Sequence, residues 1–180
     1  MKKLFLFVAA LCATVALNAA VFEVKSDSPN ESDNIRRTIR GDYGTLVDGD
    51  TILLVDEAYT ENDEILTGVK VVFLAKEGVR PDISLGYPLK ITGAGLTAKG
   101  ITFSGSRVRV YGGASGDVTF EDCVFTNSDY GFFDDKPDHM GNITINNCIF
   151  SNLTKYAIYT SEEGSTAPGP ADSFTITNCT

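Results

Sequence analysis

The chain has 180 residues, with 24 acidic and 15 basic side chains and a formal net charge of −9. This length suits one domain with a substantial hydrophobic core. The acidic balance argues against nucleic acid and anionic membrane surfaces as partners, because both are recognised through basic surfaces.

The first nineteen residues have the pattern of a secretory signal peptide. Lys2 and Lys3 form a short basic start, residues 4–17 are an apolar run without charge, and small residues follow, with cleavage expected after Ala19. The apolar run is shorter than the ~20 residues that a membrane-spanning helix needs, so no transmembrane segment is expected. We therefore expect a secreted or cell-surface protein, and the signal looks bacterial.

Residues 20–50 are expected to form an N-terminal strand and a cap helix. The helix is predicted over residues 33–40, with Ser32 or Asp33 as its N-cap and Gly41 at its end. Its apolar face would cover one end of the domain that follows.

Short apolar segments separated by turn residues continue the chain. The turns are expected at Asp48-Gly49 and at residues 93–95. The predicted strands are residues 51–55, 69–75, 83–85 and 89–92.

An internal repeat then dominates the sequence. Its copies start 22, 25 and 31 residues apart and occupy residues 96–103, 118–125, 143–150 and 174–180. The first and third positions of each copy are apolar, which predicts a strand with one buried face. The fifth position holds residue types that tolerate a left-handed bend: Gly100, Asp122, Asn147 and Asn178. A second strand with an inward Ile/Cys column and an inward Phe column is expected after the bend.

A third strand is expected in each coil. Residues 130–133 align with residues 156–159, and residues 107–111 take the same place one coil earlier. Three strands per coil, joined by one tight bend and two variable loops, predict an all-β, single-stranded parallel β-helix over residues 51–180. Because the chain stops within a copy of the motif, we expect truncation at the C-terminus, with more of the chain downstream. The alternative is a partner that covers the open coil.

The N-C-x-F motif of residues 147–150 and the segment of residues 49–55 after a short helix resemble the pectate-lyase-like (pectin-lyase-like) right-handed parallel β-helix superfamily. The resemblance covers residues 21–180 and implies the fold. It leaves the activity open, because that fold carries lyases, hydrolases, esterases, adhesins and non-catalytic modules. Lyases of the superfamily use an arginine or lysine base, usually with calcium held by carboxylates. Arg107 and Arg109 are available as bases, but no acid cluster pairs with them, so no catalytic residue is assigned.

The third strand suggests a binding surface. If Val110, Phe132 and Ile158 point inward, an outward aromatic stripe follows. Rings repeated at the ~4.8 Å strand spacing suit stacking on sugar faces. The alternative is that long loops cover the rings. The expected stripe consists of Tyr111, Phe133 and Tyr159.

Two further groups of residues have competing interpretations. Asp134, Asp135 and Asp138 form an acidic loop that could hold Ca²⁺, although such a loop is more often simply solvated, and no cofactor or metal ligand is assigned. The cysteine column could crosslink neighbouring coils, but buried free thiols are the better interpretation. The cysteines concerned are Cys123, Cys148 and Cys179.

The sequence therefore favours a secreted or cell-surface β-helix protein that engages a polysaccharide or other glycan, without catalysis in this part of the chain. The alternatives are a polysaccharide lyase or hydrolase of the pectate-lyase type, and a structural or adhesive stalk.

Overall fold

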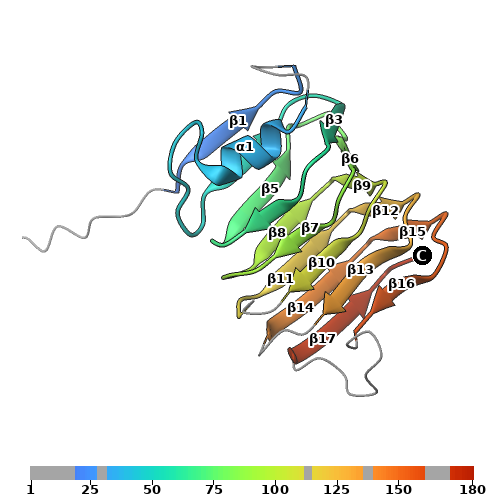
Figure 1. Ribbon diagram of the computed structural model, residues 1–180. Helices are drawn as coiled ribbons and strands as arrows, with labels where there is room; N and C mark the ends of the chain where they lie inside the picture. The colour runs from blue at the N-terminus through green and yellow to red at the C-terminus, as the bar shows by residue number, and fades with distance from the viewer. Residues whose placement is uncertain (1–18, 28–31, 112–114, 136–139, 161–170) are drawn as a thin grey trace, which may run out of the picture.

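The computed structural model describes residues 19–27, 32–111, 115–135, 140–160 and 171–180. Their strands form three parallel sheets that wind around one core, with three strands in each coil (Figure 1). This arrangement is a parallel β-helix, and it confirms the predicted fold class.

Each sheet takes every third strand along most of the chain. Sheet A contains β1 (Val21–Val24), β2 (Thr51–Leu54), β5 (Val71–Ala75), β8 (Leu96–Lys99), β11 (Val118–Glu121), β14 (Met140–Asn146) and β17 (Ala171–Thr177). Sheet B contains β3 (Ala58–Glu61), β6 (Asp82–Leu85), β9 (Thr102–Ser104), β12 (Val124–Thr126) and β15 (Ile149–Ser151). Sheet C contains β4 (Ile65–Thr67), β7 (Leu89–Ile91), β10 (Val108–Tyr111), β13 (Tyr130–Asp135) and β16 (Tyr156–Tyr159). The predicted strands before residue 93 correspond to β2, β5, β6 and β7, whereas β3 and β4 were missed.

The core is a set of vertical columns, because each strand pairs in register with the equivalent residues of the next coil. Val118, for example, pairs with Leu96 on one side and Ile143 on the other, and all three are buried. In sheet B, the rings of Phe103, Phe125 and Phe150 stack at centroid distances of 5.5 and 5.0 Å. Stacking of like side chains therefore supplies much of the apolar contact between coils.

The predicted bends are confirmed. Asp122, Asn147 and Asn178 have φ angles of 55°, 52° and 56°, and Gly100 has a φ of 73°. The Asn147 amide donates a 2.6 Å hydrogen bond to Asp122 Oδ1 in the coil before it. A second left-handed column at the end of the sheet B strands was not predicted. It consists of Gly105, Asn127 and Asn152.

Glycines occupy the corner where sheet C leads into sheet A. A Cβ on Gly116 would lie 1.4 Å from the carbonyl oxygen of Ala94, and one on Gly93 would lie 1.9 Å from that of Gly68. Backbones of successive coils therefore approach at this corner as closely as only glycine permits.

The helix α1 (Asn34–Arg40) covers the N-terminal end of the core, as predicted, and buries Ile35. Gly41 ends it with a φ of 91°. Asp33 occupies the N-cap position, but its side chain makes no capping bond to the helix. Instead, Asp33 Oδ1 accepts hydrogen bonds from the backbone N–H groups of Asn62 (2.7 Å) and Asp63 (3.0 Å).

The described cysteines are all free, which confirms the interpretation of the column as thiols. Cys123 and Cys148 are buried, and their thiols lie 3.3 Å from the carbonyl oxygens of Glu121 and Asn146. Carbonyl oxygens of the coil before, those of Ala98 and Phe120, also lie within hydrogen-bond distance of these thiols, at 3.5 and 3.7 Å.

Candidate functional site

The strand register of sheet C corrects the predicted aromatic stripe. Phe133 and Tyr159 do share a position in the stack, but the residue of β10 opposite Phe133 is Arg109, whereas Tyr111 lies opposite Asp135. A shift of two residues preserves the alternation of inward and outward side chains, so the apolar pattern of β10 could not distinguish the two registers. The inward positions were right for Val110 and Phe132, which are buried, and Ile158 packs against the core.

Some candidate residues cannot be placed in full. Asp138 lies outside the described residues, as do the side chains of Phe133, Asp134 and Asp135. The backbone puts Phe133, Asp134 and Asp135 at the end of β13. The calcium hypothesis for this loop therefore stays a prediction. Among the described residues, no group of three or more His, Cys, Asp or Glu side chains is arranged to hold a metal ion.

Tyr111 lies between two cations on the outward face of sheet C. Lys90 and Arg109 are paired neighbours on β7 and β10. Lys90 Nζ and Arg109 Cζ each lie 4.9 Å from the centre of the Tyr111 ring, which is 42% exposed. Lys90 also forms a salt bridge with Glu64. The contacts hold Tyr111 in place while leaving much of its surface open to a ligand.

A cluster of three tyrosines lies on the next two coils of sheet C. The ring centroids of Tyr130 and Tyr156 are 6.0 Å apart, and Tyr159 lies 5.5 Å from Tyr130 and 5.6 Å from Tyr156. Tyr130 is buried, whereas Tyr156 is 57% exposed. The exposed ring is thus supported from behind by the other two.

Cations flank the tyrosine cluster as well. Arg107 Cζ and Lys155 Nζ lie 5.2 and 5.0 Å from the centre of the Tyr130 ring. Arg107 NH1 also forms a 3.0 Å salt bridge with Asp129. Sequence reasoning missed Tyr130 and Tyr156, although both stand at the first position of the aligned third-strand segments.

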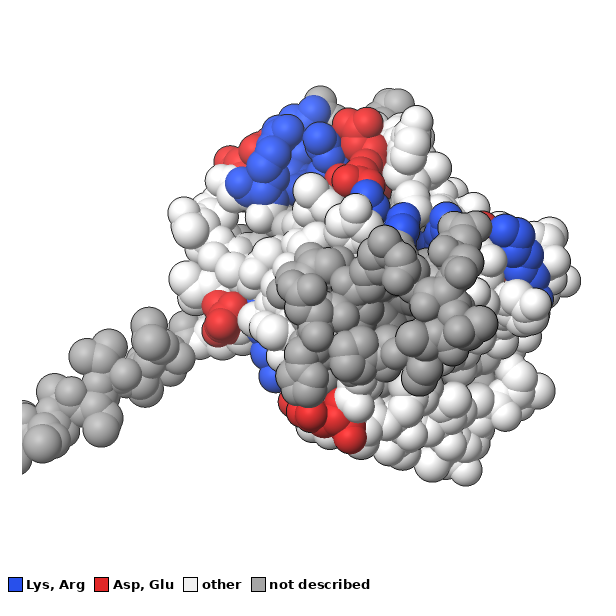
Figure 2. Space-filling view, turned by 60° about the horizontal axis from the view of Figure 1, so that its bottom comes forward, with Lys and Arg blue, Asp and Glu red and all other residues white. Residues whose placement is uncertain are grey.

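The surface of this sheet differs in charge from the chain as a whole. The chain is acidic, yet four cations contact tyrosine rings on this sheet, two at the exposed Tyr111 and two at the buried Tyr130, and two of the four are also paired with Glu64 and Asp129: Lys90, Arg109, Arg107 and Lys155. Figure 2 shows that Lys and Arg side chains gather along one side of the molecule, with acidic side chains between them. The net charge of the chain therefore does not describe the local charge of this surface, which suits an anionic ligand.

The geometry defines a class of protein: a parallel β-helix with an aromatic and basic surface on one sheet. A family model described as "Right handed beta helix region" matches residues 35–180, so the chain belongs to this family. No curated protein matches the chain. Among the residues that the structure describes, no helix has the length and apolar character needed to cross a membrane.

Proposed function

We propose that this protein binds a polysaccharide outside the cytoplasm, along sheet C. The observation that carries the proposal is the pair of exposed tyrosines, Tyr111 and Tyr156, each supported by neighbouring rings or cations. Aromatic rings bind sugars by stacking against their C–H faces, and exposed rings on a rigid sheet need little reordering to do so. The signal-peptide pattern of the first nineteen residues supports export.

Two subsites follow from the positions of these rings. Tyr111 and Tyr156 are two coils apart and, by strand register, about five positions apart along the strands. With ~4.8 Å between strands and ~3.3 Å per residue, their backbones lie roughly 19 Å apart. A ligand that engages both must therefore be a chain of several sugar units.

The cations favour an acidic polymer over a neutral one. Guanidinium and ammonium groups form charge-assisted hydrogen bonds with carboxylates and sulfates. Since the cations on sheet C are at least partly exposed to solvent, salt is expected to weaken binding.

Affinity gel electrophoresis tests the proposal. The chain is run through gels that contain polygalacturonate, alginate or a neutral glucan, and we expect retardation by the acidic polymers. Tyr111→Ala and Tyr156→Ala should each reduce the retardation, and Arg109→Gln should reduce both the binding and its dependence on salt.

Tyr43→Ala is the matched control, because Tyr43 is 45% exposed and lies in the turn after α1, where it lines a hollow beside β1. If Tyr111→Ala and Tyr156→Ala migrate like wild type and like Tyr43→Ala in the gels that retard wild type, the sheet C surface is not the binding site.

A further inference from the structure

The strand β1 has one backbone edge without a strand partner among the described residues. It is the terminal strand of sheet A and pairs only with β2 (Figure 1). The carbonyl groups of Ala20 and Val24 accept hydrogen bonds from Thr51 (2.8 Å) and Val55 (3.4 Å) on the β2 side. Alternate residues of a strand direct their N–H and C=O groups to opposite edges. The backbone groups of Val21, Glu23 and Lys25 therefore point away from β2.

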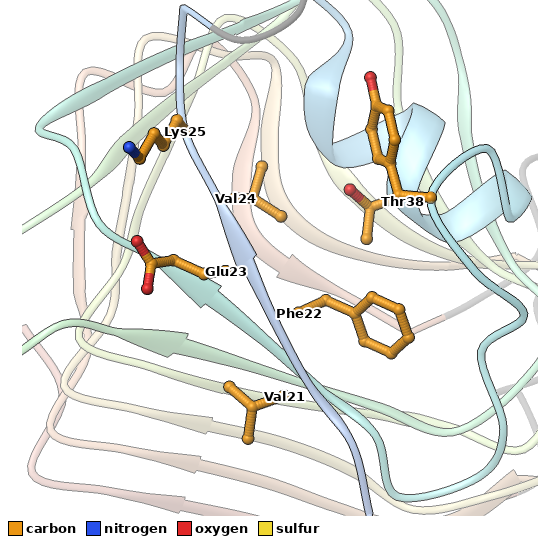
Figure 3. Close-up of a pocket in the computed structure, with 7 residues that line it drawn as sticks. Val21, Phe22, Glu23, Val24, Lys25 and Thr38 are labelled. Atoms are coloured by element: carbon orange, nitrogen blue, oxygen red, sulfur yellow. The ribbon is translucent and has the colours of Figure 1, made fainter.

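A hollow of about 480 Å³ follows this edge. Five consecutive residues, Val21 to Lys25, line it together with Thr38 and Tyr43. Because consecutive residues of a strand alternate between its two faces, a hollow lined by all five runs along the edge and not over one face. In Figure 3, Phe22 and Thr38 lie on one side of β1, and Glu23 and Lys25 lie on the other.

The two sides of the hollow differ in chemistry. On the side of α1, the wall is formed by the Phe22 ring and the Thr38 side chain. On the other side, Glu23 and Lys25 are exposed and carry opposite charges two residues apart. Two residues is the spacing of neighbouring side chains on one face of a strand.

We propose that this groove receives an extended segment of another polypeptide, which adds to sheet A as a strand beside β1. Main-chain hydrogen bonds to Val21, Glu23 and Lys25 would supply affinity, as in other cases of strand addition. The charges set the chemistry of the peptide: a basic residue opposite Glu23, an acidic residue opposite Lys25, and apolar residues on the side of Phe22 and Val24. This site is separate from sheet C, so it does not depend on the proposed polysaccharide binding.

A short labelled peptide tests the backbone pairing directly. The probe is acetyl-Thr-Ile-Lys-Val-Glu-amide, whose five residues face Val21 to Lys25 in parallel register, and its binding is followed by fluorescence anisotropy. Methylation of the backbone nitrogen of its fourth residue removes the donor to the Glu23 carbonyl. Methylation at the third residue alters a nitrogen that points to solvent, and this peptide is the matched control. We expect roughly tenfold weaker binding for the first methylated peptide than for the second.

A variant of the chain provides the complementary test. Glu23→Pro removes the N–H that faces the groove, and it leaves the bonds between β1 and β2 intact because the Glu23 backbone does not face β2. We expect it to lose peptide binding while keeping the thermal unfolding midpoint of wild type. Glu23→Gln, which keeps the N–H group, should retain most of the binding.

Sedimentation at the same concentrations identifies the occupant. A dimer that Glu23→Pro abolishes would assign the edge to a second copy of the chain and overturn the proposal. No saturable binding of the unmethylated probe at millimolar concentration, or equal binding of the two methylated peptides, would also overturn it.

Discussion

The carboxylate of Glu61, at the end of β3, accepts a 2.8 Å hydrogen bond from the backbone N–H of Ile35 in the first turn of α1. Its other oxygen accepts from Arg36 at 3.1 Å. Asp33 in turn accepts hydrogen bonds from the N–H groups of Asn62 and Asp63. A carboxylate beside the helix therefore binds N–H groups of the first coil, and a carboxylate of the first coil binds N–H groups of the helix. Glu61 thus serves α1 as a capping residue supplied from another element.

Stability should fall as the pH rises through neutrality. Burial raises the pKa of Glu61 from 4.5 to about 7, although the hydrogen bonds from Ile35 and Arg36 oppose the shift. The folded state therefore binds the proton more tightly than the unfolded state, and this stabilisation is complete below pH 4.5 and lost through pH 7. We expect the contribution of Glu61 to the free energy of unfolding to decrease by up to about 3 kcal/mol across this range.

Urea denaturation at several pH values, for wild type and Glu61→Gln, checks this prediction. The Gln variant cannot titrate at this position and should show a flatter profile between pH 4.5 and 7. Profiles of equal slope for the two proteins would show that Glu61 does not control the pH dependence.

Gly116→Ala should destabilise the protein by about 3 kcal/mol or more, because its Cβ would overlap the Ala94 carbonyl in the neighbouring coil. Gly68→Ala is the matched control at the same corner, since a Cβ there meets nothing within 4 Å. It should change the free energy of unfolding by no more than about 0.5 kcal/mol. Similar unfolding midpoints for the two variants would contradict the close approach of these coils.

Two substitutions of Asn147 separate the effect of its left-handed backbone from the effect of its side-chain hydrogen bond. Asn147→Val places a β-branched residue at a φ of 52° and should cost about 2 kcal/mol or more. Asn147→Gly loses only the hydrogen bond to Asp122 and accepts the left-handed conformation, so its cost should stay near 1 kcal/mol. Equal unfolding free energies for the two variants would indicate that the left-handed bend is not a constraint.

The three stacked thiols should differ in reactivity. The neighbouring Cys148 thiol and, after it, burial raise the pKa of Cys123, which disfavours its reactive thiolate. Cys179 is only partly buried. Timed alkylation with iodoacetamide, mapped by mass spectrometry, should label Cys179 first and Cys123 only after unfolding. Rapid labelling of Cys123 in the folded protein would contradict its burial.

The repeat made the fold predictable, because each column of the β-helix is visible in the sequence as a recurring residue type. The positions that escaped prediction lack such recurrence. Tyr59 has no counterpart in a repeat of the sequence. In the structure its buried hydroxyl donates a 2.6 Å hydrogen bond to the Val24 carbonyl and helps to fix β3. The capping role of Glu61 was likewise invisible, since it depends on a contact with α1 across 26 positions of the chain.

The proposed binding surface on sheet C was only partly predictable for a different reason. Alternation identified Val110 and Phe132 as inward residues of the third strands, but it could not fix the register between β10 and β13. The cations around Tyr111 come from β7 and β10, so the proximity of Lys90 to the ring depends on the register between these two strands. The second left-handed column could have been found, because Asn127 and Asn152 recur at the same 25-residue spacing as Asp122 and Asn147 in the first column.

The regular register also has an evolutionary consequence. Asp122 and Asn147, the residues that turn two successive coils, lie 25 positions apart and contact each other directly. Removal of residues 122–146 would join Glu121 to Asn147 and bring equivalent positions of the remaining coils into contact. Duplication of the same stretch would add one coil without changing any column. A protein built in this way can lengthen or shorten by whole coils through recombination within its own gene while its cap stays intact. The same events would change the spacing between Tyr111 and Tyr156, because the exchanged coil lies between them.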